Sequence, residues 1–131
     1  MIVVDSPIWI DYFNSPVARG TVALSEVFKR KESIAIHAIA MTEVLMGFKN
    51  ERHFKAARTA LLNVPKLVSS VESHLKAAQL FRDLKRKGVT VRGAIDCIIA
   101  QASIDSNGIL LTRDRDFEQI AKWSDLKIWR V

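Results

Sequence analysis

Acidic residues interrupt or end apolar segments at four places in this chain. Asp5 directly follows the run "IVV", and Glu43 interrupts "AIAMTEVLMGF". Asp96 interrupts "GAIDCIIAQAS", and "LLTRDRDF" supplies Asp114 and Asp116 after another apolar run. Because an unpaired buried carboxylate is costly, each of these acids must reach water, a basic side chain or a metal ion. Gathered in one cleft, they would form an oxygen-rich cation site.

Each acid also has an ordinary structural explanation. Asp5 can cap a helix, Glu43 can pair with a basic residue, and Asp96 suits the first turn of a helix. The segment "TRDRDF" can be a solvated run of charges at a helix start. The functional interpretation therefore depends on whether the fold brings the acids together.

Short apolar runs alternate with segments of helical periodicity along one domain, residues 1–131. We expect strands at residues 2–4, 33–38, 66–70, 109–112 and 126–131. We expect helices at residues 6–14, 17–31, 38–50, 51–64, 71–88, 91–108 and 114–123. This alternation predicts an α/β protein, a three-layer α/β/α sandwich around a central parallel sheet of four to five strands.

Two details of these helices concern the acids. Ser6 is expected to be the N-cap of the first helix, with Pro7 at its first position. In the helix that carries Asp96, an apolar stripe that includes Ile95 and Ile99 is expected to face the core. Asp96 lies off that stripe among small neighbours, which leaves room beside its carboxylate.

The expected sheet offers a place where the acids can meet. Ligands of open α/β sheets bind outside the carboxyl ends of the strands. Asp5 follows the strand at 2–4, and Asp114 and Asp116 follow the strand at 109–112, so neighbouring strands would bring them face to face. Oxygen ligands without a histidine or cysteine cluster suit Mg²⁺ or Mn²⁺, which can polarise a phosphoryl oxygen and activate water.

The bulk composition adds two expectations. Twenty lysines and arginines oppose fourteen acids, for a formal net charge of +6. This charge favours an anionic partner such as nucleic acid, although ordinary solubility explains it equally well. A single cysteine, Cys97, and the lack of a long apolar run or a secretion signal predict a soluble protein of the reducing cytoplasm, with no membrane association.

Taken together, "VVDSPIWIDYF", "MTEVLMGF", "GAIDCIIAQAS" and "LLTRDRDFEQIA" resemble the four acidic motifs of PIN domains. They are most similar to the VapC-type toxins of toxin–antitoxin pairs, over nearly the whole chain. The resemblance implies a metal-dependent endoribonuclease that hydrolyses phosphodiester bonds in RNA, often tRNA, and so inhibits translation. It also implies a homodimer and a cognate antitoxin protein that blocks the cleft.

The resemblance assigns roles to individual residues. It implies a catalytic set of Asp5, Glu43, Asp96 and Asp114, in which Asp5 and Asp96 hold Mg²⁺, or Mn²⁺, directly. Asp116 stays open as an alternative to Asp114. Ser6 and Thr112 match hydroxyl positions that support the site.

Three arginines near these motifs are candidate ligands for RNA phosphates: Arg92, Arg113 and Arg115. For each of them, a solvated surface position is the competing interpretation.

Other classes of small α/β protein fit the sequence less well. A phosphate-accepting receiver domain needs an aspartate after its third strand, where this chain has "KLVSS". A dehalogenase-type phosphatase needs Asp-x-Asp after its first strand, where this chain has Asp5-Ser6-Pro7. A non-catalytic RNA-binding or partner-binding module remains open, and divalent-dependent RNA cleavage is the discriminating observation.

Overall fold

The computed structural model describes every residue, 1–131, and contains five strands and seven helices. The strands are β1 (Ile2–Val4), β2 (Ile34–His37), β3 (Lys66–Leu67), β4 (Ile109–Thr112) and β5 (Lys127–Arg130). The helices are α1 (Ser6–Asn14), α2 (Arg19–Lys29), α3 (Ala38–Leu45), α4 (Glu51–Leu62), α5 (Val71–Arg86), α6 (Ala94–Asp105) and α7 (Asp116–Lys122). No helix is both long and apolar enough to cross a membrane.

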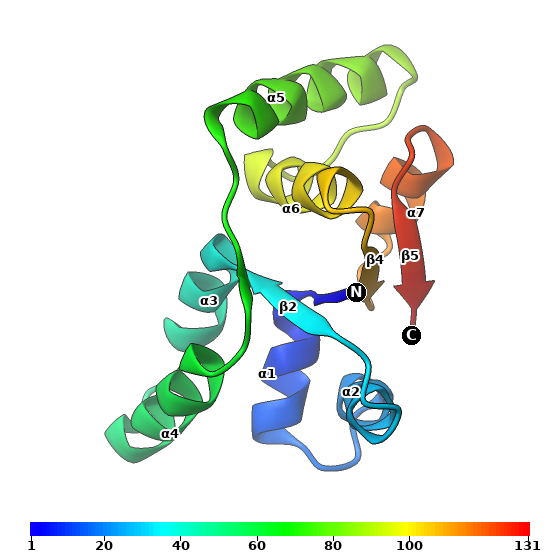
Figure 1. Ribbon diagram of the computed structural model, residues 1–131. Helices are drawn as coiled ribbons and strands as arrows, with labels where there is room; N and C mark the ends of the chain where they lie inside the picture. The colour runs from blue at the N-terminus through cyan, green and yellow to red at the C-terminus, as the bar shows by residue number, and fades with distance from the viewer.

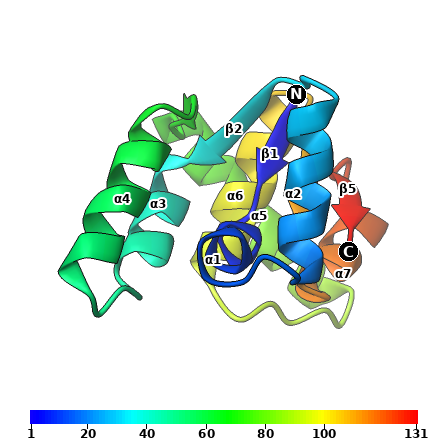
Figure 2. The same cartoon turned by 90° about the horizontal axis from the view of Figure 1, so that it is seen from below.

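The strands form one parallel sheet in the order β3-β2-β1-β4-β5. Helices α5, α6 and α7 cover one face, and α1 and α2 lie on the other, with α3 and α4 beside β2 (Figures 1 and 2). The predicted three-layer sandwich with a central parallel sheet is thereby confirmed. Strand β1 lies between β2 and β4, so the first and fourth strands are neighbours, as the meeting of the acids required.

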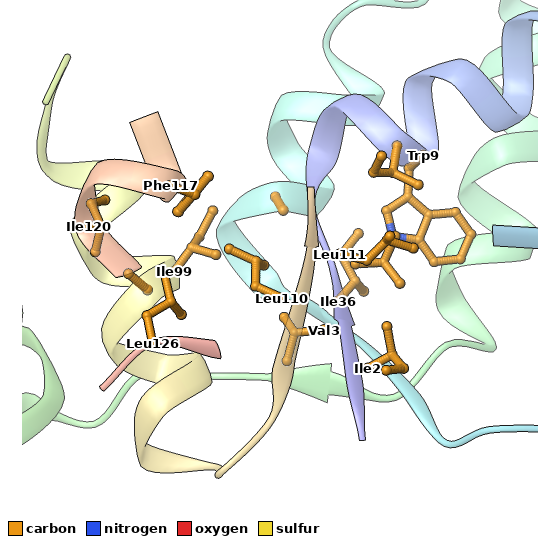
Figure 3. Close-up of a cluster of buried hydrophobic side chains, with 14 of the residues drawn as sticks. Ile2, Val3, Trp9, Ile36, Ile99, Leu110, Leu111, Phe117, Ile120 and Leu126 are labelled. Carbon is orange, nitrogen blue, oxygen red and sulfur yellow. The ribbon is translucent and has the colours of Figure 1, made fainter. Parts of the chain in front are cut away.

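Successive side chains of the central strands point to opposite faces of the sheet and fill the core on both sides. Figure 3 shows Leu110 pointing towards Ile99 and Phe117 on one side, while Leu111 points towards Trp9 on the other. All five of these side chains are at most 1% exposed. Because successive strand residues face opposite sides, a buried parallel strand needs apolar residues at every position, which "IVV" and "ILL" supply.

The N-cap of the first helix lies one residue earlier than predicted. Asp5, not Ser6, is the N-cap: its Oδ1 accepts a hydrogen bond from the Ser6 backbone N–H at 2.9 Å. Ser6 is the first helical residue and Pro7 the second, where a missing N–H costs nothing. The prediction for Ser6 was wrong because both residue types cap helices, and only the backbone conformation decides between them.

Other helices are shorter than expected at their starts. Helix α6 begins at Ala94 rather than at residue 91, and α7 begins at Asp116 rather than at residue 114. Ile95, predicted to face the core, is 36% exposed, whereas Ile99 is 1% exposed. The first turn of α6 borders the site cleft instead of the sheet, so its apolar stripe begins only further along the helix.

Candidate functional site

Asp5 sits at the carboxyl end of the central strand and is only 3% exposed. One oxygen caps α1, and the other accepts a hydrogen bond from the Thr112 hydroxyl at 2.8 Å. Thr112 ends β4, the strand beside β1. The cap role and a role in the site are therefore compatible, since each carboxylate oxygen keeps a free lone pair after one hydrogen bond.

Thr112 continues the network into the loop after β4. Its Oγ1 accepts a hydrogen bond from the Asp114 backbone N–H at 3.0 Å. The Asp114 Oδ1 in turn accepts one from the Asp116 backbone N–H at 2.9 Å, at the start of α7. This turn chemistry fixes the loop so that Asp114 and Asp116 are both half-buried and held close to the end of the sheet.

Glu43 reaches the same region from α3. Its Oε1 accepts a hydrogen bond from the Ser6 hydroxyl at 3.2 Å, which joins α3 to the first turn of α1. Ser6 thus contacts two acids, Asp5 through its N–H and Glu43 through its hydroxyl. Ser6 and Thr112 connect Glu43, Asp5 and Asp114 through hydrogen bonds.

Asp96, in the first turn of α6, completes the group from the opposite helical layer. A cleft of about 410 Å³ is lined by Asp5, Ser6, Glu43, Arg92, Asp96 and Asp114, with Pro7 and residues 93–95. All four acids of the predicted catalytic set therefore line one cavity. Asp116 does not line this cleft, although it lies close to Asp96 and Asp114.

Burial and mutual repulsion weaken the acidity of two carboxyl groups. Burial raises the pKa of Asp5 to about 7, and the nearby charges of Asp96 and Glu43 add to that effect, while the hydrogen bonds from Thr112 and Ser6 oppose it. Burial also raises the pKa of Asp96 to about 6, with contributions from Asp114, Asp116 and Glu43 that outweigh Arg92. A site where carboxylates oppose one another in this way favours a bound cation.

The donor set fits a hard divalent cation. Asp96, Asp114 and Asp116 each offer an oxygen, and these atoms lie within 4.8 Å of one another. Octahedral ligands about 2.1 Å from Mg²⁺ lie about 3.0 Å apart when adjacent and about 4.2 Å apart when opposite, so the three side chains would have to draw closer together to share one ion. Neither Asp5 nor Glu43 belongs to this tight group. Their oxygens line the cleft next to it.

The three candidate arginines differ in what they contact. Arg92 lies at the cleft and is exposed, with its guanidinium 3.4 Å from Asp116 Oδ2 and 3.8 Å from Asp114 Oδ2. Arg113 points to α1, where it pairs with Asp11 through contacts of 3.1 and 3.3 Å. Arg115 is exposed and makes no ion pair. All three arginines line a second cavity, together with Asp114 and Asp116, but only Arg92 also lines the cleft that holds all four acids of the predicted catalytic set.

Asp11 was not among the residues singled out in the sequence, although it contacts the loop that carries two of the acids. Its position in the apolar segment "PIWIDYF" was the available signal, of the same kind as that of Glu43. Gly20 of α2 lies so close that an added Cβ would stand 2.5 Å from Asp11 Oδ2. Asp11 is thus enclosed between α2 and Arg113.

Comparison with known proteins shows the family to which this chain belongs. A sequence model of the PIN domain matches residues 2–122. The chain belongs to the PIN domain family. This PIN domain is also 32% identical over 133 aligned positions to the VapC ribonuclease Mb1587 of Mycobacterium bovis and to ribonuclease VapC11 of Mycobacterium tuberculosis. Those alignments cover 97% of this chain and 96% of each relative, so the chain belongs among the VapC proteins.

Solved structures of toxin–antitoxin complexes share the fold of this PIN domain. A chain in the crystal structure of DNA-bound VapBC from Salmonella typhimurium superposes with a TM-score of 0.81 at 21% identity, covering 98% of this chain and 96% of that one. A chain of VapBC2 from Rickettsia felis, bound to a promoter DNA fragment, gives 0.80 at 20% identity, covering 100% and 99%. At these levels of sequence identity, the similarity shows that the fold is shared and no more.

Proposed function

We propose that this PIN domain is the toxin of a type II toxin–antitoxin pair, an endoribonuclease that hydrolyses phosphodiester bonds in RNA with the help of Mg²⁺ or Mn²⁺ and so inhibits translation. The observation that carries the proposal is the convergence of Asp5, Glu43, Asp96 and Asp114 on one cleft. The similarity to VapC ribonucleases over almost the whole chain supports the same reaction.

The acids of the cleft would hold the cation. We assign Asp5 and Asp96 as direct ligands, and Glu43 and Asp114 as further ligands that act through water or a second ion. Asp116 is the alternative to Asp114, because its carboxylate also lies within 4.8 Å of Asp96. When bound, the cation would polarise a phosphoryl oxygen and lower the pKa of an attacking water.

The chain's own residues orient this chemistry. The hydroxyls of Ser6 and Thr112 fix the carboxylates of Glu43 and Asp5 through hydrogen bonds of 3.2 and 2.8 Å. Arg92 is free to leave Asp114 and Asp116 once a cation neutralises them, because it is exposed and its two contacts are long. It would then contact an RNA phosphate at the cleft, as Arg113 and Arg115 were also predicted to do.

The partners follow from the same family relationship. Chains that share this fold were solved in VapBC complexes. We therefore propose that this chain has a cognate antitoxin and that the toxin forms a homodimer. The RNA substrate and the single cysteine, Cys97, which is buried and free, support a cytoplasmic location.

A cleavage assay with purified protein tests the proposal. Wild-type protein is expected to cut RNA with Mg²⁺ or Mn²⁺ and not with a chelator, and Asp96→Asn is expected to lose at least about a hundredfold in rate because a ligand charge is removed. Glu51→Gln is a matched control, because Glu51 is an exposed acid at the start of α4 that does not line the cleft and makes no ion pair. Equal rates for wild type and Asp96→Asn would overturn the proposal.

Expression in bacteria separates catalysis from the non-catalytic alternative. Wild-type protein is expected to arrest growth and to create new RNA 5′ ends that sequencing can map. Growth arrest by Asp96→Asn, with no new ends, would instead favour an RNA-binding or partner-binding module.

A further inference from the structure

One exposed tryptophan lies between two lysines that come from different helices. Trp123, at the end of α7, is 45% exposed. The Lys87 ammonium lies 5.2 Å from its ring centroid, and the Lys122 ammonium lies 5.4 Å from it. Lys87 is the C-cap of α5, so the end of α5 and the end of α7 meet here (Figure 1). We call these three residues the Trp123 patch.

The patch has positive charge that nothing in the fold neutralises. Neither Lys87 nor Lys122 takes part in an ion pair. The preceding turn of α5 adds Lys85 and Arg86, while Asp83 and Asp125 are the acids close to the patch in sequence. A cation–π contact at an exposed site is weak and leaves the lysines free to contact a phosphate.

The cleft itself is poorly equipped to bind RNA. Its acids repel phosphates, Arg92 contacts Asp114 and Asp116, and Arg113 contacts Asp11. Of the three arginines beside Asp114, Arg115 alone makes no ion pair. Affinity for an RNA backbone must therefore come largely from cations outside the cleft. The Trp123 patch combines such cations with an exposed aromatic ring, the pair of features that single-stranded nucleic acid binds by phosphate contact and base stacking.

The patch is also close enough to act on the same RNA molecule. Trp123 follows Asp116 by seven positions along α7, or roughly 10 Å at 1.5 Å per residue. Lys87 precedes Arg92 by five positions, at most roughly 17 Å of extended chain. Gly88, with φ +77°, ends α5, and the chain from there to Arg92 joins the patch to the cleft. An RNA strand held in the cleft can therefore reach the patch within a few nucleotides.

We infer that the Trp123 patch binds an unpaired nucleotide of the RNA, a few positions from the scissile bond, with its base stacked on Trp123 and its phosphates contacted by Lys87 and Lys122. The inference rests on the proposed ribonuclease function, because it adds a subsite to the same substrate. The patch sets affinity and the choice of a single-stranded or loop region, while the acids carry out hydrolysis.

Binding of a fluorescein-labelled RNA hairpin of mixed sequence tests the inference, in an Asp96→Asn background so that the probe stays intact. Trp123→Leu is expected to weaken binding about tenfold or more, as loss of one stacked base does. Trp123→Tyr keeps an aromatic face and is expected to stay near the parent affinity. Lys87→Gln with Lys122→Gln should lower the slope of log affinity against log salt by roughly 1.4.

Matched controls remove the effects of net charge and folding. Lys49→Gln with Lys55→Gln makes the same charge change on exposed residues around α4, and should leave the salt slope near the parent value if the contact is local. Intrinsic fluorescence gives an independent readout, since Trp9 is buried and Trp129 is half-buried. RNA should quench the emission of Trp123, and Trp123→Tyr should abolish that response.

The outcomes separate this inference from the proposed function. If the wild-type protein cleaves RNA and the patch variants bind RNA with the affinity of the parent protein, the inferred role of the patch is overturned and the proposed ribonuclease function is supported. If RNA binding depends on the patch but the wild-type protein does not cleave RNA, the patch is an RNA-binding surface, and both the ribonuclease and the subsite next to a scissile bond are overturned. If Trp123→Leu changes the oligomeric mass and leaves RNA affinity unchanged, the patch is a protein interface and the inference is overturned.

Discussion

Thr112 donates a hydrogen bond to Asp5 at 2.8 Å across 107 positions of sequence, and the same hydroxyl oxygen accepts the N–H of Asp114. The buried Thr112 side chain therefore orients the Asp5 carboxylate directly, and it also fixes the loop that carries Asp114. The contact exists because β1 and β4 are adjacent parallel strands that end together at the cleft.

Replacing Thr112 with valine tests this link. Valine keeps the shape but removes the hydroxyl that donates to Asp5 Oδ2 and accepts from the Asp114 N–H, so we expect a loss of about 1–3 kcal/mol in the free energy of unfolding at pH 8. Because the lost hydrogen bond lowers the pKa of Asp5, that pKa should rise further and divalent-ion affinity should fall. Thr112→Ser should restore both, and calorimetric Mg²⁺ titration measures the difference.

The metal-free protein is expected to become less stable as pH rises. Asp5 has a folded pKa of about 7 against an ordinary value of 3.8, and Asp96 one of about 6. Between these values the two carboxyl groups bind more protons in the folded state than in the unfolded state, so their contribution lowers the free energy of unfolding from about pH 4 to about pH 7. Burial lowers the pKa of His37, and the opposing contribution of this group is confined to the range below its ordinary value of 6.5. Denaturant unfolding in a chelator at a series of pH values measures this slope.

Asp5→Asn identifies the group responsible for most of that slope. The variant should lose the whole slope between about pH 6 and pH 7 and about half of it between about pH 4 and pH 6, and should be more stable than wild type at pH 8 by roughly 1–3 kcal/mol. Asp125→Asn, an exposed control, should follow the wild-type curve. A metal-free wild type whose stability rises between pH 5 and pH 8 would contradict the burial of an unpaired Asp5. Saturating Mg²⁺ should stabilise wild type and not Asp5→Asn.

The Asp11–Arg113 pair holds the loop that carries Asp114 and Asp116. Two contacts, at 3.1 and 3.3 Å, join a half-buried Asp11 to a partly exposed Arg113. Arg113→Gln should therefore reduce the free energy of unfolding by about 0.5–1.5 kcal/mol and weaken Mg²⁺ binding several-fold. Asp11→Asn should have the same two effects, because it removes the other half of the pair.

The neighbouring Arg115 provides the matched control, because it is exposed and makes no ion pair. Arg115→Gln should leave stability and Mg²⁺ affinity unchanged. If Arg113 is instead a phosphate ligand, Arg113→Gln should lower the salt slope of RNA binding by roughly 0.7 while stability stays the same. Thermal unfolding and RNA titration with both variants distinguish the two roles.

Much of the architecture was predictable because it depends on local patterns. Every expected strand and helix is present, and the strands that end on acids could be identified from short apolar runs. The rule that parallel strands present their carboxyl ends at one edge was enough to bring Asp5 towards Asp114. The roles of these residues in catalysis and metal binding are still predictions that the experiments above address.

The sequence by itself determined the type and order of the elements and the unusual positions of the acids, since hydrophobic periodicity and the cost of burying charge act over a few residues. Only the tertiary structure decided that β1 lies between β2 and β4, that Asp5 rather than Ser6 caps α1, and that Ile95 borders the cleft. It also paired Arg113 with Asp11 and set Trp123 between two lysines. Such contacts depend on packing between residues far apart in the chain, and several geometries are compatible with the same local pattern.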